Sequence, residues 1–284
     1  MDNAIEIRGL TKAYPGFLLN DIRMDLPKGS ILGLVGENGA GKSTLIKLLL
    51  KGIPKDGGTV RILDIDQEDA DFGSVKKSVG VVLDEAYYPE VLTARQLDTV
   101  MRHTYSNWNS VSYREYLSRF QLPDGKLFKE MSRGMKMKLA MAVALSHEPR
   151  LLLLDEATSG LDPMVREEML DLLNEFTRDE NRSILISSHI VSDLEKICDY
   201  IAFLHKGKLL LFEEKDRLVE QYALIKLGRA DLDALDPMAL AGIREGRYGA
   251  EALVYRDRIP RSFTTEHTSL EDIILFLAKG GTAS

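Results

Sequence analysis

Apolar and polar residues alternate through much of the first 63 positions of the chain. The alternation is clear around Ile5–Ile7, over Ile22–Leu26 and again around Val60–Ile62. A period of two places every second side chain on the same face of a strand, which is typical of strands with one buried face. The first part of the chain is therefore predicted to be rich in antiparallel β structure.

Continuous apolar runs occur farther along and have a different meaning. They cover Ser30–Val35, Val79–Leu83, Leu151–Leu154 and Ser183–Ser187. Runs of this kind suit strands that are buried on both faces of a mainly parallel sheet. Because helical patterns such as Lys42–Lys51 separate them, the sequence predicts an α/β core built around that sheet.

Helical patterns replace strand patterns between about residues 90 and 147. Met137, Met141 and Leu145 recur one turn apart. This spacing is typical of a helix that faces the core, and methionine in such a stripe favours packing over cofactor binding. We interpret the segment as a helical insertion in the α/β core.

The pattern changes again beyond about residue 220. Ala223–Leu227 and Ala252–Tyr255 predict strands, and Ser269–Ala278 predicts an amphipathic helix. Ser269 is its expected N-cap, and Glu271 lies near the positive end of the helix dipole. These residues are expected to form a small α+β subdomain.

A hairpin made of Tyr200–Leu204 and Leu209–Phe212 is expected to close the main domain. We therefore predict a main domain over residues 1–220, with the helical insertion at about 90–147, and an accessory subdomain over residues 221–284.

Composition and charge narrow the possible functions. Hydrophobic residues make up 44% and charged residues 29% of the chain, which indicates a folded protein. The formal net charge of −7 disfavours free-standing nucleic-acid binding, because that normally needs a basic face. A single cysteine, Cys198, cannot form an intrachain disulfide. No uncharged apolar stretch is long enough to span a bilayer.

The strongest chemical signal lies directly after the apolar run Ser30–Val35. Gly36–Ser43 fits G-x-x-x-x-G-K-[ST], the pattern of phosphate-binding loops, between a predicted strand and a predicted helix. Glycines let the backbone wrap closely, and its N–H groups form an anion nest with the helix N-terminus. Lys42 would reach the β- and γ-phosphates, and Ser43 would bind Mg²⁺. The phosphate-binding residues are predicted to be Gly36, Glu37, Asn38, Gly39, Ala40, Gly41, Lys42, Ser43 and Thr44.

An acidic pair, Asp155 and Glu156, follows the run Leu151–Leu154. Ligands bind at the carboxyl ends of strands in open parallel sheets, so these side chains are expected beside the phosphate-binding loop. Asp155 would hold Mg²⁺ through water, and Glu156 would act as general base on an attacking water.

Several further segments, in this order, resemble the nucleotide-binding subunit of ATP-binding cassette (ABC) transporters. Ser159–Asp162 stands where that family has its D-loop, and Ser187–His189 matches its switch histidine. Tyr14 matches the aromatic residue ahead of the phosphate-binding loop, and Met131–Met135 stands at the signature L-S-G-G-Q. The resemblance covers about residues 3–220.

The resemblance implies roles for five further residues. His189 would close over the γ-phosphate as a catalytic residue, and Tyr14 would stack on adenine. Ser132, Gly134 and Asp162 would contribute to ATP binding across a dimer. Ser132 and Asp162 also have the ordinary property of good helix N-caps, which they are expected to use as well.

Two departures from the family pattern stand out. The signature has Arg133 in place of its first glycine and Met135 in place of glutamine. After Val79–Leu83 the family has a glutamine that contacts Mg²⁺, and here Asp84 takes its place. A carboxylate could bind Mg²⁺ directly, but it would also repel the γ-phosphate.

Two tyrosines, Tyr87 and Tyr88, and Pro89 follow this position. In the family this region lies beneath the membrane subunit, so an aromatic docking surface is one interpretation. Ordinary half-buried tyrosines are an equally supported one.

Together the resemblance implies an ATPase that uses ATP and Mg²⁺ and works as a head-to-tail dimer with a second copy or a paralogous subunit. It would drive a separate integral-membrane permease, as an ABC-2-type exporter, from the cytoplasmic face of the cell membrane. A soluble ABC protein acting on ribosomes or DNA is the alternative, although such proteins usually carry two cassettes or a coiled-coil insertion. A P-loop small-molecule kinase would leave Ser132, Asp162 and His189 unexplained.

Overall fold

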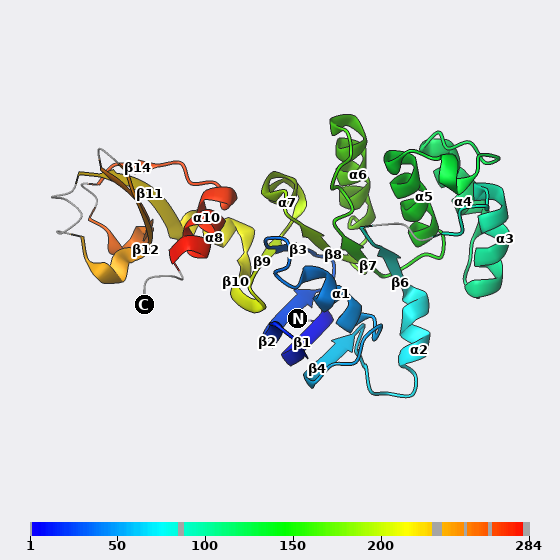
Figure 1. The fold of residues 1–284 in the computed structure, drawn as a ribbon, viewed down its shortest axis with the longest axis horizontal. Helices are drawn as coiled ribbons and strands as arrows, with labels where there is room; N and C mark the ends of the chain where they lie inside the picture. Colours follow the sequence, from blue (N-terminus) through cyan, green and yellow to red (C-terminus); the bar gives the residue numbers. More distant parts are fainter. Residues whose placement is uncertain (1, 85–87, 229–234, 247–248, 261–262, 281–284) are drawn as a thin grey trace.

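A computed structural model of the chain describes residues 2–84, 88–228, 235–246, 249–260 and 263–280. Within these residues the strands form an N-terminal, a central and a C-terminal sheet (Figure 1). The central sheet carries the carboxyl ends at which the predicted motifs occur, so it is the element that positions the site.

The N-terminal sheet is antiparallel, with strand order β2-β1-β4-β5. Its strands are β1 (Asn3–Tyr14), β2 (Phe17–Pro27), β4 (Gly57–Ile62) and β5 (Ile65–Asp66). Ile5, Ile7 and Ile22 are fully buried, as their alternation predicts. A tight hairpin at Pro15 and Gly16 pairs Tyr14 with Phe17.

The central sheet has the strand order β10-β9-β3-β8-β7-β6 and is parallel apart from β10. Its strands are β3 (Ile31–Val35), β6 (Val79–Val82), β7 (Leu151–Asp155), β8 (Ser183–Ser188), β9 (Tyr200–His205) and β10 (Lys208–Glu214). The predicted strands and the closing hairpin are thus confirmed, with bounds that differ by one or two residues.

Both faces of the central sheet are covered. Alternate residues of β7 enter two different cores, Leu151 and Leu153 one of them and Leu152 and Leu154 the other. The first core also contains α1 (Lys42–Leu49) and the N-terminal sheet, and the second contains the helices that follow. Burial on both sides is the reason that the strand sequences are continuously apolar.

The helices of the second core lie on the opposite face of the sheet from α1 (Figure 1). Among them, α3 (Ala94–Thr104), α4 (Ser110–Arg119) and α5 (Arg133–Leu145) occur between β6 and β7. Met137, Met141 and Leu145 are buried, so the predicted helical insertion and its core-facing stripe are confirmed. The remaining elements of the main part are α2 (Phe72–Val75), α6 (Pro163–Phe176), α7 (Val191–Ile197) and the 3₁₀ turns η1 (Lys76–Ser78) and η2 (Phe128–Glu130).

The C-terminal sheet has the order β12-β13-β11-β14, and two of its strands lie where the sequence predicts them. Its elements are α8 (Lys215–Gln221), β11 (Tyr222–Leu227), η3 (Pro237–Ala239), β12 (Leu240–Glu245), β13 (Ala250–Tyr255), η4 (Arg256–Arg258), β14 (Thr265–Glu266) and α10 (Leu270–Gly280). Strand β12 escapes prediction because Gly242 interrupts its short apolar pattern, where Phe276 of α10 packs closely against the backbone. The Ser269 hydroxyl accepts a hydrogen bond from the Asp272 N–H at 3.1 Å, so the predicted cap is confirmed.

Candidate functional site

The order of the central strands brings distant motifs to one edge of the sheet. Strands β3, β8, β7 and β6 are consecutive neighbours and run parallel. Their carboxyl ends are followed by the predicted phosphate-binding loop, His189, Glu156 and Asp84 respectively. Topology therefore gathers four segments that are far apart in the sequence.

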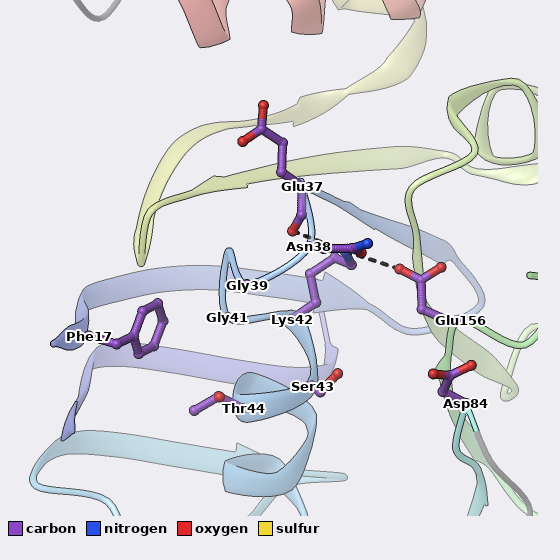
Figure 2. Close-up of a pocket in the computed structure, with 10 residues that line it drawn as sticks. All are labelled: Phe17, Glu37, Asn38, Gly39, Gly41, Lys42, Ser43, Thr44, Asp84 and Glu156. Atoms are coloured by element: carbon purple, nitrogen blue, oxygen red, sulfur yellow. Dashed lines mark hydrogen bonds and ion pairs between the residues drawn. The ribbon is translucent and has the colours of Figure 1, made fainter. Parts of the chain in front are cut away.

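A pocket of about 430 Å³ lies at this edge. It is lined by Phe17, Glu37, Asn38, Gly39, Gly41, Lys42, Ser43, Thr44, Asp84 and Glu156. Figure 2 shows Phe17 on one side of the pocket and Glu156 with Asp84 on the other, with the loop residues between them. Most of the predicted phosphate-binding residues thus share one cavity with the predicted base.

The loop has the backbone that an anion nest needs. Gly39 and Gly41 have φ angles of 82° and 113°, values that residues with a side chain rarely adopt. A Cβ on Gly41 would also lie 2.9 Å from the Phe17 ring. Because α1 begins directly after Gly41, its N-terminal N–H groups face the pocket region. Two predicted loop residues are not part of the lining, since Ala40 is buried and Gly36 contributes only its carbonyl, which accepts a bond from Lys42 Nζ at 2.7 Å.

Glu156 lies between two predicted catalytic groups. Lys42 Nζ is 3.0 Å from its Oε1, and His189 Nδ1 is 2.6 Å from its Oε2. The Lys42 and Glu156 side chains are only 6% and 12% exposed, so water screens their attraction little. The three residues predicted from separate motifs form one hydrogen-bonded and ionic network.

Ser187 holds the acidic pair in place, a role that the sequence did not reveal. Its hydroxyl donates to Asp155 Oδ1 at 2.6 Å and accepts from the Glu156 N–H at 3.0 Å. Glu156 has a φ of 52°, which is uncommon for a residue with a side chain and requires support from its surroundings. The only sequence signal for Ser187 is its place two residues before His189, at the end of a neighbouring strand.

The aromatic residue at the pocket is Phe17 and not Tyr14. Tyr14 is 42% exposed, lies outside the pocket lining, and has Lys12 Nζ 5.4 Å from its ring centroid. The role of Tyr14 in stacking on adenine stays a prediction, and Phe17, its partner across the hairpin, is the aromatic residue that lines this pocket. The sequence signal for Phe17 is that a second aromatic residue directly follows the turn residues Pro15 and Gly16.

Ser132, Gly134 and Asp162 lie outside the pocket of their own chain. Ser132 accepts a hydrogen bond from the Met135 N–H at 3.3 Å, and Asp162 accepts one from the Val165 N–H at 3.1 Å. Both therefore act as helix N-caps, for α5 and α6, as expected. None of the three side chains shares the pocket with the phosphate-binding loop of its own chain.

The predicted magnesium ligands are all hard oxygen donors, which is the type that Mg²⁺ requires. Ser43 and Asp84 line the pocket, while Asp155 is 4% exposed and lies next to Glu156. Within the described part of the chain no cluster of three acidic, histidine or cysteine side chains forms a ready-made metal site.

The region after Asp84 is only partly described. Tyr87 lies outside the described residues, whereas Tyr88 packs edge-to-face on Phe128 with 5.6 Å between the ring centroids. Burial raises the pKa of Tyr88 above its usual range. For Tyr88, the half-buried interpretation is therefore the one that the contacts support. Pro89 is exposed.

No helix in the described part of the chain combines the length and the apolar character needed to cross a bilayer.

Comparison with known proteins gives a consistent result. The family model described as "ABC transporter" matches residues 19–159. A model described as "AAA domain, putative AbiEii toxin, Type IV TA system" matches the shorter segment 127–192.

Two curated relatives are similar over most of their length. The chain is 32% identical over 230 residues to the ABC transporter ATP-binding protein YtrB of Bacillus subtilis, covering 78% of this chain and 76% of the relative. It is 33% identical over 215 residues to the lantibiotic transport ATP-binding protein SrtF of Streptococcus pyogenes, covering 75% and 91%. A solved structure titled "Structure of ATP binding subunit of ABC transporter" superposes with a TM-score of 0.69 at 26% identity, covering 77% of this chain and 92% of that one.

Proposed function

The chain belongs to the ATP-binding proteins of ABC transporters and is an ATPase, and we propose that it powers an exporter whose membrane-spanning subunit is a separate protein. The lantibiotic transport protein among its relatives supports the outward direction. The permease would be an integral-membrane protein, and the chain would work at the cytoplasmic face of the membrane. We further propose that residues 1–220 form the ATPase domain and residues 221–284 the accessory subdomain.

The observation that supports a two-subunit ATPase is that the predicted ATP contacts lie at two separate places on one chain. Residues of the phosphate-binding loop and Glu156 line one pocket, and His189 contacts Glu156, whereas Ser132, Gly134 and Asp162 lie outside that pocket. A second subunit packed head to tail would place its Ser132 region over the ATP. ATP then contacts both subunits only in the closed dimer, so its binding shifts the population toward closure.

The residues of the network would each contribute to hydrolysis. Lys42 would bind the β- and γ-phosphates, Glu156 would accept a proton from the attacking water, and His189 would contact the γ-phosphate. The water oxygen bonds to the γ-phosphorus, the bond to the β–γ bridging oxygen breaks, and ADP and phosphate leave. Loss of the γ-phosphate removes the contacts that hold the dimer closed.

Ser43, Asp155 and Asp84 would hold Mg²⁺ beside the phosphates. When bound, the ion neutralises charge on the phosphate oxygens. Phe17 would face the base of the nucleotide, because it lies across the pocket from Glu156 (Figure 2).

Glu156→Gln tests the proposal, because it keeps the size of the side chain and removes the base. In ATP and Mg²⁺ the variant is expected to accumulate as a dimer with about twice the monomer mass by light scattering. Lys42→Ala is the control, since a chain that cannot hold the phosphates should stay monomeric. A Glu156→Gln chain that remains monomeric at saturating ATP would contradict the head-to-tail mechanism.

The same variant tests the membrane partner. Full-length Glu156→Gln chain, purified through a tag from detergent-solubilised membranes of its native host, is expected to bring down one multi-span membrane protein, identified by mass spectrometry. Recovery of ribosomal proteins or DNA in its place would support a soluble ABC protein and overturn the exporter assignment.

A further inference from the structure

Arg133 in the signature and Asp84 at the family's glutamine position, two departures from the family pattern, contact each other. Arg133 is the first residue of α5, and its Nη2 donates to Asp84 Oδ1 at 3.2 Å. The two residues are 49 positions apart in the sequence. Asp84 follows β6 of the central sheet, while Arg133 belongs to the helical insertion. The ion pair therefore connects the core to the signature helix within one chain.

A third segment, the turn that contains Gly160, lies close to the guanidinium of Arg133. A Cβ built on Gly160 would lie 3.0 Å from Cζ and from Nη1 of Arg133. Gly160 belongs to the turn between Glu156 and α6 and has a φ of 67°. Arg133 thus lies between the backbone of this turn on one side and the Asp84 carboxylate on the other.

Asp84 also belongs to the nucleotide pocket. It lines the cavity together with Ser43 and Glu156, and Figure 2 shows it beside Glu156 at the pocket edge. In this position the Asp84 carboxylate would have to bind two cations, the guanidinium of Arg133 and the Mg²⁺ proposed above. A single carboxylate that turns toward the phosphates weakens its bond to Arg133.

The strength of the pair suits a contact that opens and closes. Both side chains are more than half exposed, 56% and 55%. Exposed ion pairs contribute about 0.2–1 kcal/mol, so that ligand binding can break them. A buried pair in the same place would resist this, because removing one partner leaves a charge without compensation.

We propose that the Asp84–Arg133 pair is a strap that competes with Mg²⁺ for Asp84 and lowers the affinity for Mg²⁺-bound ATP until the strap opens. Opening releases the signature helix from the core strand and frees Arg133 for the phosphates of the partner subunit. Arg133 is in this respect a positioning residue that acts through Asp84. The inference rests on the proposed function, specifically on Asp84 as a magnesium ligand.

The test compares ATP affinity with Mg²⁺ and with EDTA, by calorimetry, at concentrations where light scattering shows a monomer. Arg133→Gln removes the competitor, so the ratio of the two affinities is expected to rise about 1.4- to fivefold, the range that an exposed pair allows. Arg133→Lys keeps a cation and should retain most of the wild-type ratio. Arg95→Gln is the matched control, because Arg95 forms a similar exposed pair with Asp124 in the helical insertion. Its ratio should stay at the wild-type value.

A double-mutant cycle identifies the carboxylate through which Arg133 acts. In an Asp84→Asn background, Arg133→Gln is expected to leave the ratio unchanged, since the shared partner is gone. If Arg133→Gln changes the affinity equally with Mg²⁺ and with EDTA, Arg133 acts on the nucleotide directly and the strap is refuted.

The experiment also distinguishes an error in the strap from an error in the proposed magnesium site. If Ser43→Ala and Asp155→Asn reduce the Mg²⁺ effect but Arg133→Gln does not alter the ratio, the metal site stands and the strap is wrong. If none of the variants, Asp84→Asn included, changes the Mg²⁺ effect, both the metal assignment and the strap are overturned.

Discussion

The Glu156 carboxylate contacts both Lys42 and His189. These are the two groups that we propose bind the γ-phosphate. At the residue scale, the proposed base and the proposed phosphate-binding groups therefore form one network.

Phe17 is an aromatic pocket residue that the sequence prediction did not name. Its ring lines the pocket, whereas Tyr14, its partner across the hairpin, does not. Phe17→Ala is expected to weaken ATP binding about tenfold or more, because stacking of a base on an aromatic ring contributes about 1–3 kcal/mol. Isothermal calorimetry with ATP would measure this.

Tyr14→Ala and Leu18→Ala provide the comparison, since both side chains are more than 40% exposed on the same hairpin. Each should change the affinity less than threefold, or about 0.6 kcal/mol. A larger loss from Tyr14→Ala than from Phe17→Ala would return the stacking role to Tyr14.

At the scale of elements, Ser132 at the start of α5 is expected to have two roles, one in the stability of the helix and one in hydrolysis. Ser132 caps the helix, and removal of such a cap costs about 0.5–2 kcal/mol of stability. The same residue lies outside the pocket of its own chain. A substitution there should therefore separate ATP binding by the monomer from hydrolysis by the dimer.

Ser132→Arg is expected to reduce hydrolysis more than tenfold (about 1.4 kcal/mol) while calorimetry shows unchanged ATP affinity of the monomer. The large side chain would fill the space that the partner's ATP needs. Ser132→Ala also loses the cap but leaves that space open, so it should keep more of the activity. Weakened ATP binding by monomeric Ser132→Arg would place Ser132 in its own pocket and contradict the head-to-tail arrangement.

Elements of regular pattern were the easiest to predict. Leu151–Leu154 is a strand because four apolar residues in a row find burial on both faces of the sheet. Strand β12 was missed because Gly242 gives no packing signal within its own segment. Its place in the sheet depends on pairing with β13 and on the contact with α10, and neither is a local property.

The whole molecule is elongated, with the C-terminal sheet at one end and the helical insertion at the other (Figure 1). The C-terminal part is nevertheless tied to the ATPase core. Leu270 and Ile273 of α10 share one buried cluster with Leu194 of α7, and Glu195 Oε1 accepts a bond from the Leu270 N–H at 3.2 Å. Helix α7 begins at Val191, two residues after His189, so the accessory part packs on the helix next to the predicted switch histidine.

Ile273→Ala is expected to lower the free energy of unfolding by about 2–4 kcal/mol, because it leaves a cavity in that shared cluster. Denaturant unfolding followed by circular dichroism should show one transition shifted as a whole. Leu275→Ala is the control on the same helix, since Leu275 is 43% exposed, and it should cost less than about 0.5 kcal/mol. A separate early transition in Ile273→Ala would mean that the accessory part unfolds independently.

The sequence by itself determined the chemistry of single segments: the phosphate-binding loop, the acidic pair after a buried strand, and the helix caps at Ser132 and Asp162. Each of these depends on residues within a few positions of one another, so local spacing is enough to predict it. The tertiary structure alone decided which side chains share a pocket or a bond, including Phe17 at the pocket, Ser187 beneath the acidic pair, and Arg133 on Asp84. The physical reason is that strand order and helix packing set the distances between remote residues, and no local pattern records them.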